Sequence, residues 1–214
     1  MMTQGYMIVC DGSNGAGKTT IIQAIKAHLE SKGREIVVTR EPGGTPIGEK
    51  IREIVLSSAT PELCAITELM LFAAARAQHI QEKILPALQA GKIVISDRFD
   101  AATISFQHYA RGLSLELTLQ LNNLALDGFK PDMNIILDLD PLLGLQRVQA
   151  RGAGLDRMES EHIDFLKKAR YGYLEQARQD PERFRVIDAS QSLEKVILEV
   201  LGIVDQLTSV SRTF

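Results

Sequence analysis

The chain has little cysteine, no excess of basic residues and no long apolar run. Its 214 residues include two cysteines, and 24 Lys and Arg stand against 27 Asp and Glu. Cys10 and Cys64 are too few for a disulfide framework or a metal site, so we expect both to be reduced packing residues. A net charge of -3 disfavours a nucleic-acid partner, which would require clustered basic side chains. Because no apolar run is long enough to cross a bilayer and no export signal is present, we expect a cytoplasmic protein without a membrane partner.

Short β-branched segments alternate along the chain with longer segments of helical period. We expect strands at residues 6–10, 35–39, 92–96, 133–139 and 184–188. We expect helices at residues 18–31, 47–57, 66–90, 101–109, 115–126, 142–150, 161–179 and 193–207. This alternation predicts an α/β fold of the P-loop NTPase type, with a five-stranded parallel sheet between two layers of helices. No repeat or Ser/Pro-rich linker interrupts the pattern, so residues 1–214 are read as one domain.

A glycine-rich loop, DGSNGAGKTT, directly follows the first predicted strand. Gly12, Gly17, Lys18 and Thr19 fit the pattern GxxxxGK[ST] between a strand and a helix, where backbone N–H groups surround phosphate oxygens. Lys18 would reach the β and γ phosphates of ATP, and the Thr19 hydroxyl would bind Mg²⁺. Thr20, taken alone, is a residue of the first helical turn. The expected ATP-binding loop comprises Gly12, Ser13, Asn14, Gly15, Ala16, Gly17, Lys18, Thr19 and Thr20.

Arginines recur near the ends of the predicted strands. Asp97 and Arg98 end the third strand, at the edge where ligands of open parallel sheets bind. Asp97 could hold Mg²⁺ or orient a nucleophilic oxygen and Arg98 could pair with an anion, whereas an isolated Asp-Arg pair would be a surface ion pair. Arg40, Arg52 and Arg76 extend this set. Guanidinium groups hold phosphates in a fork geometry, so the set predicts an acceptor that carries its own phosphate.

The P-loop alone is shared by many protein classes. A guanine-reading NKxD motif is absent from the sequence, which disfavours a Ras-like GTPase, and the charge balance disfavours a nucleic-acid motor. However, the segments DGSNGAGKTT, TREPGGT, LMLFAAARAQ, SDRFDAATISFQ, PDMNIILDL and ARGAGLDR, in this order and spacing, closely resemble thymidylate kinases. The resemblance covers nearly the whole chain. It implies a homodimer that transfers the γ-phosphate of ATP to dTMP, giving dTDP for dTTP synthesis.

The resemblance also implies an acceptor site. Phe72 would stack on the thymine ring and Arg76 would donate to a base carbonyl, although an apolar residue on a long helix is more often a core residue. Phe106 and Gln107 match an aromatic-Gln pair of the family near the sugar, where the Phe106 ring would crowd a 2′-hydroxyl unless it belongs to the core. Thr103 would read the base edge or lie on the helix surface. The implied acceptor contacts are Asp11, Asn14, Arg40, Pro42, Arg52, Phe72, Arg76, Arg98, Thr103, Phe106 and Gln107.

The segment ARGAGLDR resembles the mobile lid of the family, at about residues 150–160. An arginine brought in by a lid can neutralise charge that develops on the transferred phosphoryl group. Members of the family carry a catalytic arginine either in the P-loop or in the lid. Because the P-loop here has none, the resemblance implies that Arg151 supplies this charge, with Arg157 as the second candidate. Arg147 shares a helix face with Arg151 or faces solvent. The implied catalytic set is Lys18, Asp97, Arg98, Arg151 and Arg157, with Thr19 and Asp97 as metal ligands.

Three positions depart from the family pattern. Relatives usually have an acidic residue at the position of Asn14, which accepts a hydrogen bond from the 3′-hydroxyl of the acceptor sugar. A neutral acceptor weakens this bond, since a charged partner contributes about 1.5 to 3 kcal/mol against about 1 for a neutral one. Asp11 either compensates or caps the strand end, while Phe99 replaces Tyr or His and Ala102 replaces Ser. These departures leave two alternatives: another nucleoside monophosphate or deoxynucleoside kinase, or a nucleotide-binding regulator without catalysis.

Overall fold

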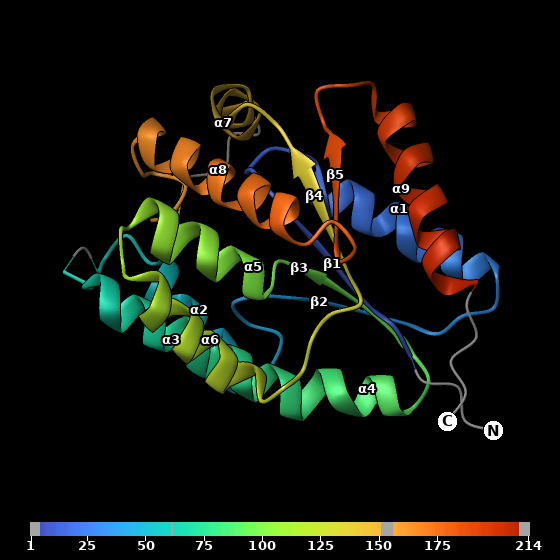
Figure 1. Ribbon diagram of the computed structural model, residues 1–214, viewed down its shortest axis with the longest axis horizontal. Helices are drawn as coiled ribbons and strands as arrows, with labels where there is room; N and C mark the ends of the chain where they lie inside the picture. The colour runs from blue at the N-terminus through green and yellow to red at the C-terminus, as the bar shows by residue number, and fades with distance from the viewer. Residues whose placement is uncertain (1–4, 61, 151–155, 210–214) are drawn as a thin grey trace.

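The computed structural model describes residues 5–60, 62–150 and 156–209. A five-stranded parallel sheet runs through the molecule, with helices on both of its faces (Figure 1). Its strands are β1 (Met7–Gly12), β2 (Ile36–Arg40), β3 (Ile93–Asp97), β4 (Met133–Asp138) and β5 (Phe184–Asp188). Their order in space is β2-β3-β1-β4-β5, which places β1 at the centre. The expected α/β architecture is therefore confirmed.

Helical segments connect the strands and follow the last of them. They are α1 (Lys18–Ser31), α2 (Pro46–Leu56), α3 (Ala65–His79), η1 (Ile80–Ile84), α4 (Leu85–Gln89), α5 (Asp100–Thr103), η2 (Ile104–Ala110), α6 (Leu115–Leu126), α7 (Pro141–Gln149), α8 (Ile163–Gln179) and α9 (Leu193–Thr208). Every helix expected from the sequence is present within a few residues of its expected bounds.

Two of the expected helices contain a π-helical turn that the sequence pattern did not predict. In η1 the N–H of Leu85 bonds to the carbonyl of Ile80, five residues earlier, just before Pro86. Proline has no N–H to donate and its ring crowds the preceding turn, and a wider turn relieves both problems. In η2 the N–H of Arg111 bonds to the carbonyl of Phe106 in the same way.

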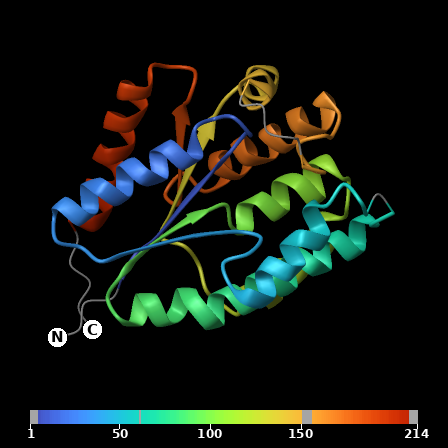
Figure 2. The same ribbon diagram turned by 180° about the vertical axis from the view of Figure 1, so that it is seen from behind.

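The central strand β1 is buried on both faces. Ile8 and Cys10 pack with α1 and α9 on one face, and Met7 and Val9 pack with η1, α4 and α6 on the other. Figure 2 shows α1 and α9 side by side on the first face. A strand covered on both sides reads as a continuous apolar run, which is why residues 6–10 show no polar alternation.

The cysteines differ from each other. Cys10 is buried, as expected, whereas Cys64 is exposed at the start of α3, so the expectation that both are packing residues is wrong for Cys64. Both are free thiols.

Parallel pairing brings the loops after β1, β2 and β3 to one edge of the sheet. Cys10 pairs with Asp97 in register, and Arg40 pairs with Asp97 from the other side. The P-loop, Arg40 and Asp97 therefore meet at the carboxyl edge of three adjacent strands. Within the described part of the chain, no helix combines the length and the apolar character that a membrane span requires.

Candidate functional site

The P-loop requires glycine at defined positions. Gly12, Gly15 and Gly17 have φ angles of 122°, 74° and 94°, in the left-handed region that side chains disfavour. A Cβ on Gly12 would lie 2.2 Å from the carbonyl oxygen of Leu137, and one on Gly15 would lie 2.3 Å from that of Gly144. The loop can therefore pack this closely against β4 and α7 only if residues 12 and 15 are glycines.

Lys18 lies folded over the P-loop. Its Nζ donates to the carbonyl oxygens of Ser13 at 3.0 Å and Gly12 at 3.4 Å. Burial, with a smaller contribution from the charge of Arg98, lowers the pKa of Lys18 to about 8. The carbonyl dipoles of Gly12 and Ser13 compensate only part of the hydration that the ammonium group loses on burial. A phosphate bound above the loop would add compensation and so favour the charged form of Lys18.

A cavity of about 530 Å³ opens in front of this loop, and we call it the P-loop cavity. Thr19, Asp97 and three of the expected acceptor arginines line it together with Lys18. These arginines are Arg40, Arg52 and Arg98. The structure thus brings the donor-binding residues and the guanidinium groups from three separate segments to one space.

Arg98 is held in place from several directions. Its backbone has a φ of 68°, which costs a non-glycine residue free energy. Its guanidinium donates to the carbonyl of Gly12 at 3.1 Å, to the hydroxyl of Tyr173 at 2.8 Å and to Oδ1 of Asn14 at 2.5 Å. The hydroxyl of Tyr173 in turn donates to Asp11 at 2.9 Å. The side chain of Arg98 is therefore oriented by the P-loop and by α8 at once.

Burial and neighbouring charges shift the pKa values of Asp11 and Arg98. Burial raises the pKa of Asp11 to about 7, although Arg98 and Tyr173 act in the opposite direction. Burial also acts to lower the pKa of Arg98, but the Tyr173 phenol and the carboxylates of Asp11 and Asp97 outweigh it, and the pKa is raised. Arg98 therefore stays cationic beside the P-loop cavity. Asp11 is fully buried beneath the loop, so the structure does not place it in contact with an acceptor.

A second, smaller cavity of about 90 Å³ adjoins the first, and we call it the inner cavity. It shares Asn14, Arg52 and Arg98 with the P-loop cavity. The expected acceptor residues that line the inner cavity are Asn14, Pro42, Arg52, Phe72, Arg76, Arg98, Thr103, Phe106 and Gln107. Leu56, Phe99 and Met158 add apolar surface. The lining thus combines apolar surface with a few polar groups, the composition typical of small-molecule sites.

Arg76 is almost completely buried and extensively bonded. Its Nε donates to Glu41 at 2.8 Å, one Nη donates to Asn122, and the other donates to the carbonyl of Phe99 and to Oγ1 of Thr103, both at 3.0 Å. A guanidinium has five N–H donors, so within the described residues one N–H on Nη1 is left for a ligand. Thr103 is buried at this contact, which corrects the alternative that it lies on the helix surface.

The loop after β2 is held by the same charge network. His79 Nδ1 lies 3.0 Å from Glu41, and its Nε2 lies 2.7 Å from the hydroxyl of Thr39. The Glu41–Pro42 peptide is cis, and Arg52 donates to the carbonyl of Pro42 at 2.9 Å. Glu41 lines both cavities, so this network fixes a wall that they share.

Phe106 packs in the core and also lines the inner cavity. Its ring lies 6.0 Å from that of Phe165 and 6.1 Å from that of Tyr173, and it lines the inner cavity. The guanidinium of Arg98 lies 5.2 Å from its centroid, a cation–π contact. Phe72 also lines the inner cavity and is half-buried.

The lid arginines have different positions. Arg151 lies outside the described residues. Arg157 donates through Nε to the carbonyl of Val55 at 2.8 Å and through Nη2 to the carboxylate of Glu68, so it packs against α2 and α3. This position differs from the expectation that it reaches the transferred phosphoryl group, because a buried carboxylate holds it elsewhere. Arg147 lies near the carbonyl of Gly15, at 3.5 Å, which corrects the solvent-facing alternative.

Several residues of the site were not found from the sequence. Tyr173 and Glu68 contact the site through hydrogen bonds to residues far away in the chain, and no local motif indicates them. Glu41 and Asp156 lie inside the segments TREPGGT and ARGAGLDR, so a signal was present for both.

Arg40, one of the predicted acceptor residues, lines the P-loop cavity but not the inner cavity. It is exposed, and its guanidinium pairs with Glu49 at 2.9 Å.

Comparisons with known proteins agree with this geometry. The family model described as thymidylate kinase matches residues 10–200 of the chain. A thymidylate kinase of Hahella chejuensis (strain KCTC 2396) is 46% identical over 195 residues, which cover 91% of this chain and 93% of that protein. A thymidylate kinase of Geobacillus sp. (strain WCH70) is 42% identical over 206 residues, covering 95% and 98%. The chain therefore belongs to the thymidylate kinase family.

Proposed function

We propose that this protein transfers the γ-phosphate of ATP to dTMP, giving dTDP. The main support for this proposal is that two cavities adjoin each other and that Arg98 lines both of them. One cavity faces the P-loop, and the other combines apolar surface with a few polar groups. A phosphate monoester whose base occupied the inner cavity would place its phosphate beside Arg98 and Arg52, opposite Lys18. This arrangement positions two phosphates for an in-line transfer.

The donor is held mainly by backbone groups. The N–H groups of the P-loop and the start of α1 would surround the β-phosphate, and Lys18 would neutralise charge on the β and γ oxygens. Since these groups are in place before the reaction, their stabilisation of developing charge needs little reorganisation.

The acceptor is held mainly by side chains. Phe72 would stack on the base, and the free N–H of Arg76 would donate to a base carbonyl. Arg40, Arg52 and Arg98 would hold the acceptor phosphate, with Arg98 kept in orientation by Tyr173 and Asn14. The bulk of Phe106 would exclude a ribose 2′-hydroxyl.

The residues present fit a Mg²⁺ ion. The Thr19 hydroxyl and the Asp97 carboxylate both line the P-loop cavity, and oxygen donors of this kind suit Mg²⁺. Among the residues that the structure describes, no group of three or more His, Cys, Asp or Glu could hold a metal. When bound, the ion would neutralise phosphate charge, with its other ligands supplied by phosphates and water.

The lid remains part of the proposal. Residues 150–160 would form it, and Arg151 would neutralise the transferred phosphoryl group, since Arg157 is bonded elsewhere. Arg151→Ala is then expected to lower kcat rather than to raise KM alone.

An acceptor panel tests the proposed function. In a coupled ATPase assay with dTMP, dUMP, dGMP, CMP, AMP and thymidine, dTMP should give the highest kcat/KM. Preference for another monophosphate would assign the altered-pocket alternative, and preference for thymidine would leave the three acceptor arginines without a partner. ATP binding without turnover on any acceptor would favour the regulator.

The expected homodimer and cytoplasmic location are part of the same proposal. The outer surfaces of α2, α3 and α6 carry exposed apolar side chains, among them Ile54, Met70 and Leu124. Burial of such a surface between two copies would stabilise a dimer. Sedimentation analysis should find a species of twice the 23.6 kDa chain mass.

A further inference from the structure

Glu68 is a buried carboxylate that the function described above does not use. It lies in the first turn of α3 and its side chain is 1% exposed. One oxygen accepts from Nε2 of Gln107 at 2.8 Å, and both oxygens accept from Arg111, at 3.2 and 3.1 Å. The second oxygen also accepts from Arg157. A side chain this buried, with three partners from two other segments, is held in one orientation.

The arginines keep Glu68 ionised. Burial by itself would raise the pKa of Glu68, but hydrogen bonds from Arg111, Gln107 and Arg157 outweigh burial, and the pKa is lowered. Arg111 is in turn held by Glu161 at 2.5 Å and by the face of Phe165, whose centroid is 4.5 Å away. The carboxylate is thus an acceptor only, because it carries no proton to donate.

This fixed charge determines how the amide of Gln107 is oriented. A carboxylate accepts but does not donate, so the NH₂ group of Gln107 must face Glu68 and its carbonyl oxygen must point away. Gln107 is 1% exposed overall and lines the inner cavity beside Arg76 and Thr103. Of the polar groups that these two side chains have left for a ligand, the Gln107 oxygen is an acceptor and the remaining N–H of Arg76 is a donor.

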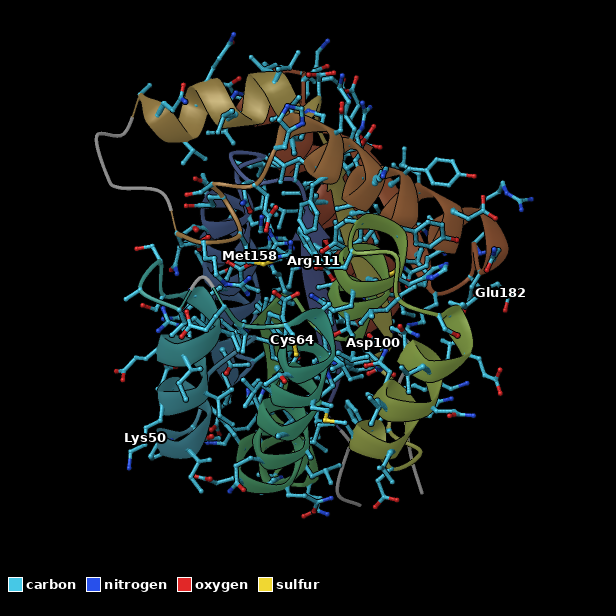
Figure 3. The ribbon with its side chains drawn as sticks, turned by 90° about the vertical axis from the view of Figure 1, so that its left-hand side faces the viewer. Lys50, Cys64, Asp100, Arg111, Met158 and Glu182 are labelled. Carbon is cyan, nitrogen blue, oxygen red and sulfur yellow. The ribbon has the colours of Figure 1, made fainter. Side chains whose placement is uncertain are left out.

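The arginine partners of Glu68 also contact two other residues that line the inner cavity, Met158 and Leu56. Arg111 lies 3.6 Å from the sulfur of Met158, which lines that cavity (Figure 3). The backbone N–H of Arg157 bonds to the carbonyl of Leu56 at 3.1 Å. Through Arg111 and Arg157, Glu68 is therefore linked to Met158 and Leu56 as well as to Gln107.

We propose that Glu68 is a positioning residue that sets the specificity of the inner cavity for the acceptor base, by holding the Gln107 amide with its oxygen toward the cavity. This inference rests on the proposed function. The expected ligand edge is an N–H beside a carbonyl, as in thymine N3–H and O4. Cytosine presents the reverse, a ring nitrogen acceptor beside an amino group, and would meet an acceptor with an acceptor and a donor with a donor.

The test is Glu68→Gln, which keeps the size of the side chain and removes its charge. An amide at position 68 donates as well as accepts, so Gln107 becomes free to turn over. We expect the ratio of kcat/KM for dTMP to that for dCMP to fall about tenfold or more. The reason is that Gln107 is then no longer fixed as the hydrogen-bond acceptor and can donate to a cytosine instead. The change should lie mainly in KM for dTMP, since Glu68 does not contact the phosphates.

Glu161→Gln is the matched control. It removes the other carboxylate that Arg111 contacts and leaves the pair of Glu68 and Gln107 intact. The dTMP/dCMP ratio should stay at the wild-type value. An equal fall in both variants would show that general loosening around Arg111 changes the ratio, and would overturn the proposal.

A double-mutant cycle tests whether Glu68 acts through Gln107. Gln107→Leu removes the acceptor and should lower the ratio at least as much as Glu68→Gln, and the double variant should show no further loss. A wild-type ratio in Gln107→Leu, or losses that multiply, would overturn the proposal. Because the ratio compares two acceptors on one preparation, a partly unfolded variant still reports it, and Gln107→Leu remains decisive if Glu68→Gln does not fold.

The outcomes also separate this inference from the proposed function. If the wild-type protein prefers dTMP and Glu68→Gln retains that preference, only the inference about Glu68 fails. If the wild-type protein does not phosphorylate dTMP, both fail.

Discussion

The groups that would bind the donor phosphates belong largely to one continuous stretch of main chain, whereas the groups of the inner cavity are side chains from distant segments. Gly12 to Thr19 supply the first set within one loop and one helix start. The second set depends on buried charges, with Glu41 holding Arg76 and Glu68 holding Gln107. The difference teaches that binding of the donor phosphates here depends mainly on a local backbone shape, while base recognition needs the whole core to be assembled.

The largest effect is expected for Lys18→Ala, at the backbone-built cavity. Loss of a charge aimed at the transferred phosphate should lower kcat by about 10²- to 10³-fold. The fold should persist, because among the described residues Lys18 bonds only to the carbonyls of Gly12 and Ser13. Activity and circular dichroism together measure this. Lys50→Ala, at an exposed lysine of α2, is the control, and an active Lys18→Ala protein would contradict the assigned role.

Arg76→Ala should break the side-chain-built cavity by lowering stability as well as activity. It leaves the buried carboxylate of Glu41 without its cationic partner, which costs about 3 to 5 kcal/mol of the free energy of unfolding. Arg40→Ala is the comparison, since its exposed pair with Glu49 contributes about 1 kcal/mol or less. Urea unfolding measures both, and equal losses would remove the contrast between the two cavities.

The pH dependence sharpens the comparison at Lys18. Its pKa is lowered to about 8, so the free protein carries the ammonium charge below that pH and loses it above. We expect kcat/KM for ATP to fall toward tenfold per pH unit above about 8, because kcat/KM reports the free protein. The kcat at saturating ATP should fall at a higher pH, since bound phosphate favours the charged form. Superimposable profiles would contradict this account.

A smaller effect is expected for Tyr173→Phe, which removes the hydroxyl that joins Asp11 to Arg98. A buried hydrogen-bonding partner of this kind contributes about 1 to 3 kcal/mol to stability. Arg98 retains Gly12 and Asn14, so KM for dTMP should rise several-fold rather than by orders of magnitude. Tyr171→Phe, exposed on the same helix, should change neither quantity. Equal behaviour of the two variants would exclude a role for the Tyr173 hydroxyl.

The sequence allowed the strands, the helices and the P-loop to be predicted because their signals are local. Apolar runs and helical periods cover five to twenty residues, and the P-loop pattern is contiguous. The acceptor residues were found through a family resemblance, and the structure gathers most of them around the inner cavity. The bond between Arg157 and Glu68 was not predicted, because Glu68 lies on another helix and no local motif connects the two residues.

By itself the sequence determined the parallel α/β architecture, the loop that surrounds a phosphate and the family to which the chain belongs. Only the tertiary structure decided that Tyr173 reaches the P-loop from α8, that Arg76 has one N–H left to donate, and that Glu68 orients Gln107. The physical reason is the range of the interactions. A backbone conformation is set by neighbouring residues, whereas the partner of a buried charge is set by which segments pack together after the chain has folded.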